Sequence, residues 1–312
     1  MRSRTPVLSA VLGVLLTATA CGGGDPATPG DGPLSDATIT VGSKDFDEQL
    51  ILGHISKLAL EDAGATVVDQ INLGGTDASR GALVSGKVDH YWEYNGTAWI
   101  SFFKETEPIP DRIEQYEVVR DRDLAENELV WLEPANFNNT YGLAFRSEAA
   151  AELGSPETIS DLASVEAGAL SLCVESEFST RDDGLPGLEK TYGFEFPDKQ
   201  VTVLDTGIVY TSTDKGQPCN FGEIFTTDGR IGALDLTVLE DDKAFFPLYN
   251  ASPVFTKEVM DSHGEELTEL YGPITEALTQ DVMTDLNKRV SADGERPEQV
   301  AKSWLEDNDL IG

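Results

Sequence analysis

The sequence predicts an α/β protein of two lobes, each built around an open α/β sheet, with a ligand cleft between the two sheets. Strand-type and helix-type segments alternate along residues 38–140, the alternation restarts at Tyr141, and after Pro253 the chain is expected to be helical. Open α/β sheets bind ligands beyond the carboxyl ends of their strands, and pockets favour domain interfaces. Two facing lobes therefore predict a binding site in the cleft.

The first alternation opens with a short β-type run at residues 38–41, which Gly42 closes. Residues 50–63 then repeat apolar side chains with the rhythm of a helix, and Gly64 ends it. The same patterns give strands at 38–41, 66–73 and 88–91, and helices at 50–63, 78–84 and 111–127.

The second alternation predicts strands at 142–145, 170–174, 200–204, around Ile224 and at 236–239, with helices at 159–167, 185–192 and 207–215. Three more helices are expected at 265–278, 280–290 and 297–308. We therefore predict lobe 1 from residues 38–140 plus 250–312 and lobe 2 from residues 141–249, with the C-terminal helices packed back on lobe 1.

The N-terminus has the pattern of an export signal over residues 1–21. A basic start is followed by an apolar stretch of fifteen residues and by Ala18-Thr-Ala-Cys21. That stretch is shorter than the about 20 residues that span a bilayer. Its end resembles the bacterial lipobox, with Ala18 where Leu is usual, which implies a lipid on Cys21; an ordinary cleaved signal is the alternative. Residues 22–37, rich in Gly and Pro, predict a flexible tether.

Charge excludes one class of partner. Without the signal the chain has 20 basic and 56 acidic residues, a formal charge of −36. Such a surface repels phosphates, so no nucleic-acid partner is expected. It draws cations toward a cleft, and it is compatible with a salty habitat.

Cysteine use fits an exported domain. With Cys21 lipidated, Cys173 and Cys219 remain, and two cysteines outside the cytoplasm predict a disulfide, with two buried free thiols as the alternative.

No catalytic or cofactor motif is present in the sequence. None of the three histidines, His54, His90 and His263, sits in a metal-ligand pair, and His90 is expected to be packed or on the surface. The phosphate-binding loop and the nucleophile elbow are both missing. We therefore expect no cofactor, no metal and no enzymatic activity; the enzymatic alternative is an exported α/β hydrolase.

Aromatic residues stand at strand ends and lobe crossovers. Tyr94, Tyr141, Phe225 and Tyr249 all hold such positions, although each taken singly also fits a core residue. Rings converging in a cleft would form an aromatic cage for a quaternary ammonium group, which has no N–H to donate and is held by ring faces.

The chain resembles the glycine betaine/choline-binding lipoproteins of osmoprotectant ABC importers. The match runs in order from about residue 38 to the C-terminus. Its motifs are Val41-Gly-Ser-Lys-Asp-Phe-Asp-Glu-Gln49, Glu93-Tyr-Asn-Gly-Thr97, Asn138-Asn-Thr-Tyr141, Arg181-Asp-Asp-Gly-Leu-Pro-Gly187, Phe225-Thr-Thr-Asp-Gly229 and the run from Leu239 to Pro253. The resemblance implies a periplasmic-binding-protein-like fold whose cleft closes on the ligand.

By motif position, the cage residues would be the four aromatics named above. Lys44, Thr97 and Arg181 would meet a betaine carboxylate, and Arg can do so through two N–H groups. Asp77 would meet a choline hydroxyl or, equally, cap the helix that follows it. Trp92 would either add a ring or pack beside the site.

The resemblance implies an extracytoplasmic monomer, anchored to the outer face of the cell membrane, that hands a quaternary ammonium compound to the transmembrane subunits of an ABC permease. The alternatives are a binding protein for another cationic or zwitterionic solute, such as an amino acid derivative, and a purely structural envelope protein. The sequence does not rank glycine betaine against choline, carnitine or proline betaine.

Overall fold

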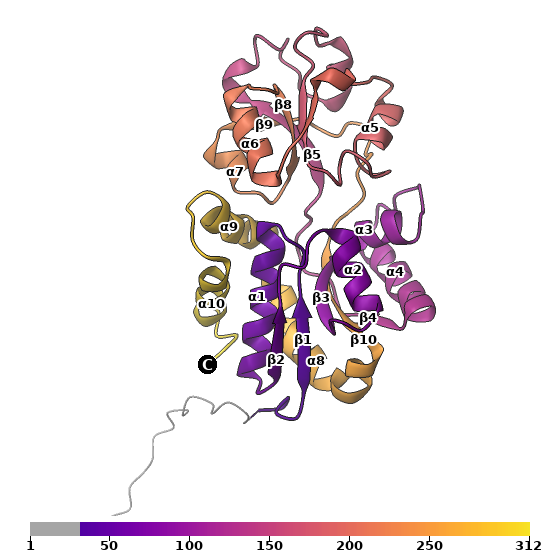
Figure 1. The fold of residues 1–312 in the computed structure, drawn as a ribbon, viewed down its shortest axis with the longest axis vertical. Coiled ribbons are helices and arrows are strands. Elements are labelled where there is room, and N and C mark those ends of the chain that lie inside the picture. Colours follow the sequence, from indigo (N-terminus) through magenta and orange to yellow (C-terminus); the bar gives the residue numbers. More distant parts are fainter. Residues whose placement is uncertain (1–31) are drawn as a thin grey trace, which may run out of the picture.

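The computed structural model describes residues 32–312, so the predicted signal, Cys21 and most of the predicted tether lie outside the described residues. Two lobes stand end to end along the long axis of the molecule (Figure 1). Each lobe contains one five-stranded sheet. Within residues 32–312, no helix combines the length and apolarity needed to cross a membrane.

Lobe 1 is built on a mixed sheet with the strand order β2-β1-β3-β10-β4. β1 is parallel to β2 and β3, whereas β10 is antiparallel to β3 and β4. Both faces of β3 are buried because helices cover both sides of the sheet. The strands are β1 (Thr38–Gly42), β2 (Thr66–Gln70), β3 (His90–Tyr94), β4 (Leu129–Trp131) and β10 (Ala251–Thr256).

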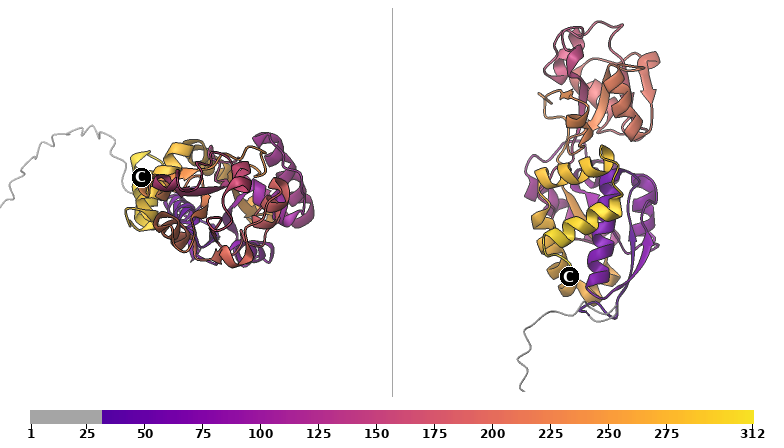
Figure 2. Two further views of the ribbon diagram at one scale, coloured as in Figure 1. Left: turned by 90° about the horizontal axis from the view of Figure 1, so that it is seen from above. Right: turned by 90° about the vertical axis from the view of Figure 1, so that its left-hand side faces the viewer.

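The helices of lobe 1 divide between the two faces of its sheet. α1 packs with α9 and α10 on one face, together with α8, while α2 and α4 contact β3, β10 and β4 from the other (Figures 1 and 2). The helices are α1 (Asp47–Asp62), α2 (Thr76–Val84), the short α3 (Asn95–Thr97), the π-helical η1 (Ala98–Phe102), α4 (Arg112–Asn127), α8 (Lys257–Ala277), α9 (Gln280–Ser291) and α10 (Pro297–Asp307).

Lobe 2 has the strand order β7-β6-β8-β5-β9, in which β5 is antiparallel to both of its neighbours. The strands are β5 (Tyr141–Arg146), β6 (Leu172–Val174), β7 (Val201–Val203), β8 (Phe221–Phe225) and β9 (Leu236–Val238). The helices are α5 (Leu185–Tyr192), α6 (Thr206–Lys215), α7 (Arg230–Ala233) and the short 3-10 segments η2 (Ser147–Ala149), η3 (Ile159–Ser164) and η4 (Asp198–Gln200).

A disulfide joins Cys173 in β6 to Cys219, two residues before β8, with a Cα–Cα distance of 5.5 Å. Both half-cystines are fully buried under Val209 of α6. The bridge therefore ties neighbouring strands of lobe 2 beneath the helix that covers them.

Two chain segments, 132–140 and 239–250, cross between the lobes (Figure 1). They run beside each other, because the Asn139 backbone N–H donates to the Tyr249 carbonyl at 3.1 Å and the Tyr249 N–H donates to the Asn138 side chain at 2.7 Å.

A buried carboxylate joins the lobes at these crossings. Glu48, in the first turn of α1, accepts hydrogen bonds from Tyr94 at 2.8 Å, Asn139 at 2.8 Å, Thr227 at 2.6 Å and Asn287 at 2.8 Å. Burial raises the pKa of Glu48, against the lowering effect of these donors. Since the donors come from both lobes and from a crossing segment, Glu48 fixes the base of the cleft.

Several expectations about elements need correction. The chain does not turn helical directly after Pro253, because β10 is a central strand of lobe 1. β4 was not predicted, and residues 159–164 form a 3-10 helix instead of a longer α-helix. His90 is packed: it is fully buried, stacks on Phe255 with ring centroids 4.1 Å apart, and burial lowers its pKa to about 3.

Candidate functional site

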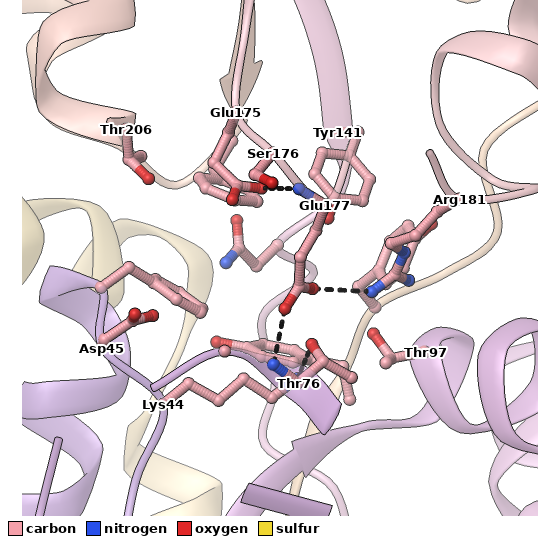
Figure 3. Close-up of a pocket in the computed structure, with 16 residues that line it drawn as sticks. Lys44, Asp45, Thr76, Thr97, Tyr141, Glu175, Ser176, Glu177, Arg181 and Thr206 are labelled. Carbon is pink, nitrogen blue, oxygen red and sulfur yellow. Dashed lines mark hydrogen bonds and ion pairs between the residues drawn. The ribbon is translucent and has the colours of Figure 1, made fainter. Parts of the chain in front are cut away.

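A cavity of about 280 Å³ lies between the lobes, walled by residues of both (Figure 3). This volume is close to the lower end of the range for ligand pockets, which suits a small solute. Seven of the eight residues that the sequence analysis assigned to ligand binding line it: Lys44, Tyr94, Thr97, Tyr141, Arg181, Phe225 and Tyr249.

Aromatic rings form much of the cavity wall. Tyr141 lies with its ring centroid 5.1 Å from that of Phe225 and 5.4 Å from that of Tyr249, the latter edge-on at 83°. Phe46 stacks on Phe225 at 5.3 Å and faces Tyr94 at 6.2 Å. We call these five residues the ring cluster. Its members come from strand ends, from the start of α1 and from the second crossing segment, which explains why residues far apart in sequence converge.

Phe46 was not assigned to the site from the sequence. It lies inside the first family motif and immediately precedes α1, so its position beside Lys44 was the available signal. A single Phe before a helix also fits a packing role, and the sequence alone did not separate the two.

Hydrogen bonds hold two of the tyrosine rings in place. Tyr94 donates its hydroxyl to Glu48, and Tyr249 donates to Asp183 at 2.6 Å. Burial raises the pKa of Tyr94, Tyr141 and Tyr249 well above the usual value. All three phenols therefore stay neutral, and their rings present uncharged π-faces.

Lys44 follows β1 and is 3% exposed. Its ammonium group donates to Glu93 at 2.7 Å and to the Thr76 hydroxyl at 3.1 Å, and it lies 5.1 Å from the Tyr94 ring centroid. Tyr91 donates to the second oxygen of Glu93 at 2.6 Å. Because a buried charge needs a partner, Glu93 compensates Lys44 within the protein itself.

Arg181 makes a two-point contact with Asp183, through Nε at 2.7 Å and Nη2 at 2.5 Å. Its third contact, from Nη1, reaches Glu177 at 3.3 Å. The guanidinium carbon lies 5.7 Å from the Tyr141 ring centroid. The arginine thus joins the ring cluster to two carboxylates.

Glu177 is a residue of the cavity that the sequence analysis missed. Its carboxylate accepts the backbone N–H of Thr76, the first residue of α2, at 2.6 Å across the cleft (Figure 3). Burial alone would raise its pKa, but the Lys44 charge, the Thr76 hydrogen bonds and the Arg181 charge together hold the pKa of Glu177 below its usual value. Glu177 is therefore ionised at neutral pH.

Asp77 does not line the main cavity. It is exposed in the first turn of α2 and borders a neighbouring cavity of about 270 Å³ together with Lys104 and Thr180. The capping interpretation was wrong, because Gly75 is the N-cap of α2 and Asp77 is the second residue of the helix.

Trp92 packs beside the site. It is 1% exposed and donates its indole N–H to Ser56 at 2.8 Å, on the α1 side of the sheet, and it is not part of the cavity wall.

Two further carboxylates, Glu175 and Glu223, lie beside each other in lobe 2. Glu175 lines the cavity, and its backbone N–H donates to Glu223 at 2.8 Å. Burial, together with the neighbouring Glu175 charge, raises the pKa of Glu223 to about 8.

Among residues 32–312, no group of three or more His, Cys, Asp or Glu side chains is arranged to hold a metal ion.

Comparison with known proteins identifies the family. The model for the substrate-binding domain of ABC-type glycine betaine transport systems matches residues 37–307. The glycine-betaine-binding protein of Pseudomonas aeruginosa is 40% identical over 282 residues, which cover 88% of this chain and 89% of that protein.

Two other relatives are similar. The ergothioneine transport permease/ergothioneine binding protein EgtU of Helicobacter pylori is 35% identical over 274 residues, 88% of this chain but 48% of that longer protein. A crystal structure of a glycine betaine/carnitine/choline ABC transporter protein superposes with a TM-score of 0.70 at 29% identity, covering 88% of this chain and 99% of that one.

These matches span both lobes and agree with the two-sheet architecture. Proteins of this kind bind solutes outside the cytoplasm for an importer and are not enzymes, as the sequence analysis expected. The chain belongs to the family of substrate-binding domains of ABC-type glycine betaine transport systems.

Proposed function

We propose that this protein captures a quaternary ammonium compound, such as glycine betaine or choline, in an aromatic cage between its lobes and delivers it to the importer's permease. The observation that carries the proposal is the ring cluster, which walls a cavity of about 280 Å³ from both lobes. A trimethylammonium group offers no N–H to donate, so ring faces are the surface that suits it.

Magnitudes support a cage of this size. A cation over a ring gains ~0.5–1 kcal/mol when exposed and about 2 kcal/mol or more when water is excluded. Three or four such contacts in a closed cleft supply several kcal/mol of the ~8 kcal/mol that corresponds to a micromolar Kd. Closure of the lobes is therefore part of the proposed binding event, because it removes the water.

Hydrogen-bond donors of the same cavity would bind a ligand carboxylate. Lys44, Thr97 and Arg181 all line it, although Lys44 and Arg181 already bind Glu93 and Asp183. A betaine carboxylate would therefore use the donor capacity that these internal pairs leave.

The position of the protein in the cell is part of the proposal. A lipid on Cys21 and the tether of residues 22–37 would hold a monomer at the outer face of the membrane, within reach of the permease. Release of Cys21→Ala protein into the medium, with the unsubstituted protein kept in the membrane fraction, would support this anchor; equal membrane retention of both would contradict it.

A second ligand class is favoured by the carboxylates in the cavity. Asp45, Glu175 and Glu177 line it beside the rings and can accept N–H groups. A zwitterionic amino acid derivative would use both surfaces, and one relative is named for ergothioneine.

Calorimetry on ligand-stripped protein tests the function. The panel is glycine betaine, choline, carnitine, proline betaine and ergothioneine, with glycine as the control that lacks the quaternary ammonium group. We expect heat with at least one quaternary ammonium compound and none with glycine. Absence of binding heat with every compound of the panel would refute the proposed function.

A further inference from the structure

The group between Lys44 and Arg181 is a carboxylate of the protein itself. Glu177 projects from lobe 2 and receives the Thr76 N–H of lobe 1 at 2.6 Å and the Arg181 guanidinium at 3.3 Å (Figure 3). The approach is close: a Cβ on Gly75 would lie 2.3 Å from Oε1 of Glu177, so any larger residue there would push the Glu177 carboxylate aside.

The donors around Glu177 are those that recognise carboxylates generally. A backbone N–H at a helix N-terminus, a guanidinium N–H and a nearby ammonium all favour a negative oxygen. These groups belong to the subsite where Lys44 and Arg181 would hold the carboxylate of a betaine. In this conformation Glu177 fills part of that subsite.

The charges of the cavity also disfavour a second carboxylate in this subsite. Its lining contains two cations, Lys44 and Arg181, and three carboxylates, Asp45, Glu175 and Glu177. Both cations also hold a further internal carboxylate, Glu93 and Asp183 respectively. A ligand that brings its own carboxylate therefore enters a region where negative charge already exceeds positive charge, and like charges a few ångströms apart repel.

We propose that Glu177 is a specificity-determining residue, a built-in carboxylate that competes with the carboxylate of the ligand. Cationic ligands without a carboxylate, such as choline, bind with Glu177 in place, whereas betaines must displace it from Thr76 and Arg181. This inference rests on the proposed function and adds the preference for a net positive ligand.

The first experiment compares choline and glycine betaine by calorimetry in Glu177→Gln, with Asp182→Asn as the matched control. Asp182 is exposed next to Arg181 and lies outside the lining of this cavity, so its substitution removes one nearby charge without touching Thr76 or the Arg181 guanidinium. We expect the ratio of betaine to choline affinity to rise at least about fivefold in Glu177→Gln and to stay within about twofold in Asp182→Asn. A ratio that is unchanged in Glu177→Gln, with both affinities reduced alike, would show a simple latch between the lobes and overturn the inference.

The second experiment needs no quaternary ammonium ligand. In Glu177→Ala the donors around the missing carboxylate are left without their acceptor, so acetate at constant ionic strength should raise the Tm of this variant and leave that of the unsubstituted protein unchanged. Equal shifts in both proteins would also overturn the inference. A protein that binds no member of the ligand panel would instead refute the proposed function, while this acetate test still decides whether the anion subsite exists.

Discussion

Tyr249 combines two contacts in one side chain. Its ring meets Tyr141 edge-on in the cavity wall, while its hydroxyl donates to Asp183, the carboxylate that holds Arg181 through two hydrogen bonds. It also lies on the second crossing segment, immediately next to the strands of lobe 1. At the residue scale, Tyr249 therefore connects the ring cluster to the carboxylate that holds Arg181, and it does so from a segment that crosses between the lobes.

Removing the Tyr249 ring should weaken binding. We predict that Tyr249→Ala raises the Kd for the preferred quaternary ammonium ligand at least about tenfold, because one desolvated ring contact is lost and water enters the cage. Calorimetry measures the change, and an unaltered Kd would exclude a cage role. Tyr249→Phe keeps the ring and loses only the bond to Asp183, so its affinity should fall less.

Glu223 should make the free energy of unfolding fall as the pH rises. Burial raises its pKa to about 8 in the folded protein, so the folded state holds this proton more tightly than the unfolded state does. The resulting destabilisation is small below the ordinary carboxyl pKa and grows as pH rises toward the folded value, by at most about 1.4 kcal/mol per pH unit.

Glu223→Gln should remove this pH dependence, because an amide does not titrate. The amide oxygen can still accept the Glu175 N–H, so the local structure should be kept. Chemical denaturation at about pH 5 and about pH 8 should show the unsubstituted protein losing more stability than the variant over that interval. Parallel losses in the two proteins would mean that Glu223 is not the titrating group.

Most residues that the sequence assigned to ligand binding line the cavity, whereas Glu177 and Phe46, which also line it, were not assigned. Residues at strand ends, such as Tyr94 and Phe225, could be placed because strand ends of an α/β lobe point to one region. Glu177 could not, because carboxylates are so frequent in this chain that one Glu before an Arg carries no signal. Its role depends on a contact across the cleft, which periodicity within one segment does not encode.

At the scale of elements, β10 shows what local patterns leave out. The run contains Pro253, which argues against a central strand, yet β10 pairs with both β3 and β4. The helices and the parallel strands were largely predictable because their apolar rhythm is local. The return of residues 251–256 to the middle of a sheet formed from residues 38–131 is a long-range event, and the sequence provides no matching signal.

The disulfide joins two neighbouring strands of lobe 2, and its contribution to stability can be measured. A cross-link that closes a loop of 46 residues should stabilise the protein by about 2–4 kcal/mol. We predict that Cys173→Ser with Cys219→Ser lowers the free energy of unfolding by this amount and leaves the ligand Kd within about twofold, because neither cysteine lines the cavity. Chemical denaturation compares the variant with the oxidised and with the reduced parent protein. Equal midpoints for the oxidised parent and the variant would contradict the prediction.

At the scale of the whole molecule, hydrogen bonds join the two lobes at separate places. Glu48 accepts from donors of both lobes, and Glu177 of lobe 2 accepts the Thr76 N–H of lobe 1. Around this core the surface carries the excess of acidic residues that gives the whole chain a formal charge of −34. Repulsion between those charges opposes the compact state.

Salt should therefore stabilise the protein. Raising KCl from about 0.05 M to about 1 M shortens the Debye length to ~3 Å and should raise Tm, by roughly 2–4 °C for each kcal/mol of repulsion relieved. Thermal unfolding over a salt series measures the slope, with sucrose as the uncharged control. A stability maximum at the lowest salt would argue against an adaptation to a salty habitat.

The central position of β10 also has a consequence for the order in which the molecule is made. All strands of lobe 2, and both cysteines of its disulfide, lie within one continuous stretch, so this lobe can reach its structure as soon as that stretch of the chain is available. The sheet of lobe 1 has a gap between β3 and β4 until residues 251–256 arrive. Lobe 2 can thus form first, and the earlier half of lobe 1 must wait, with an incomplete sheet, until a strand that follows the whole of lobe 2 in the sequence is available.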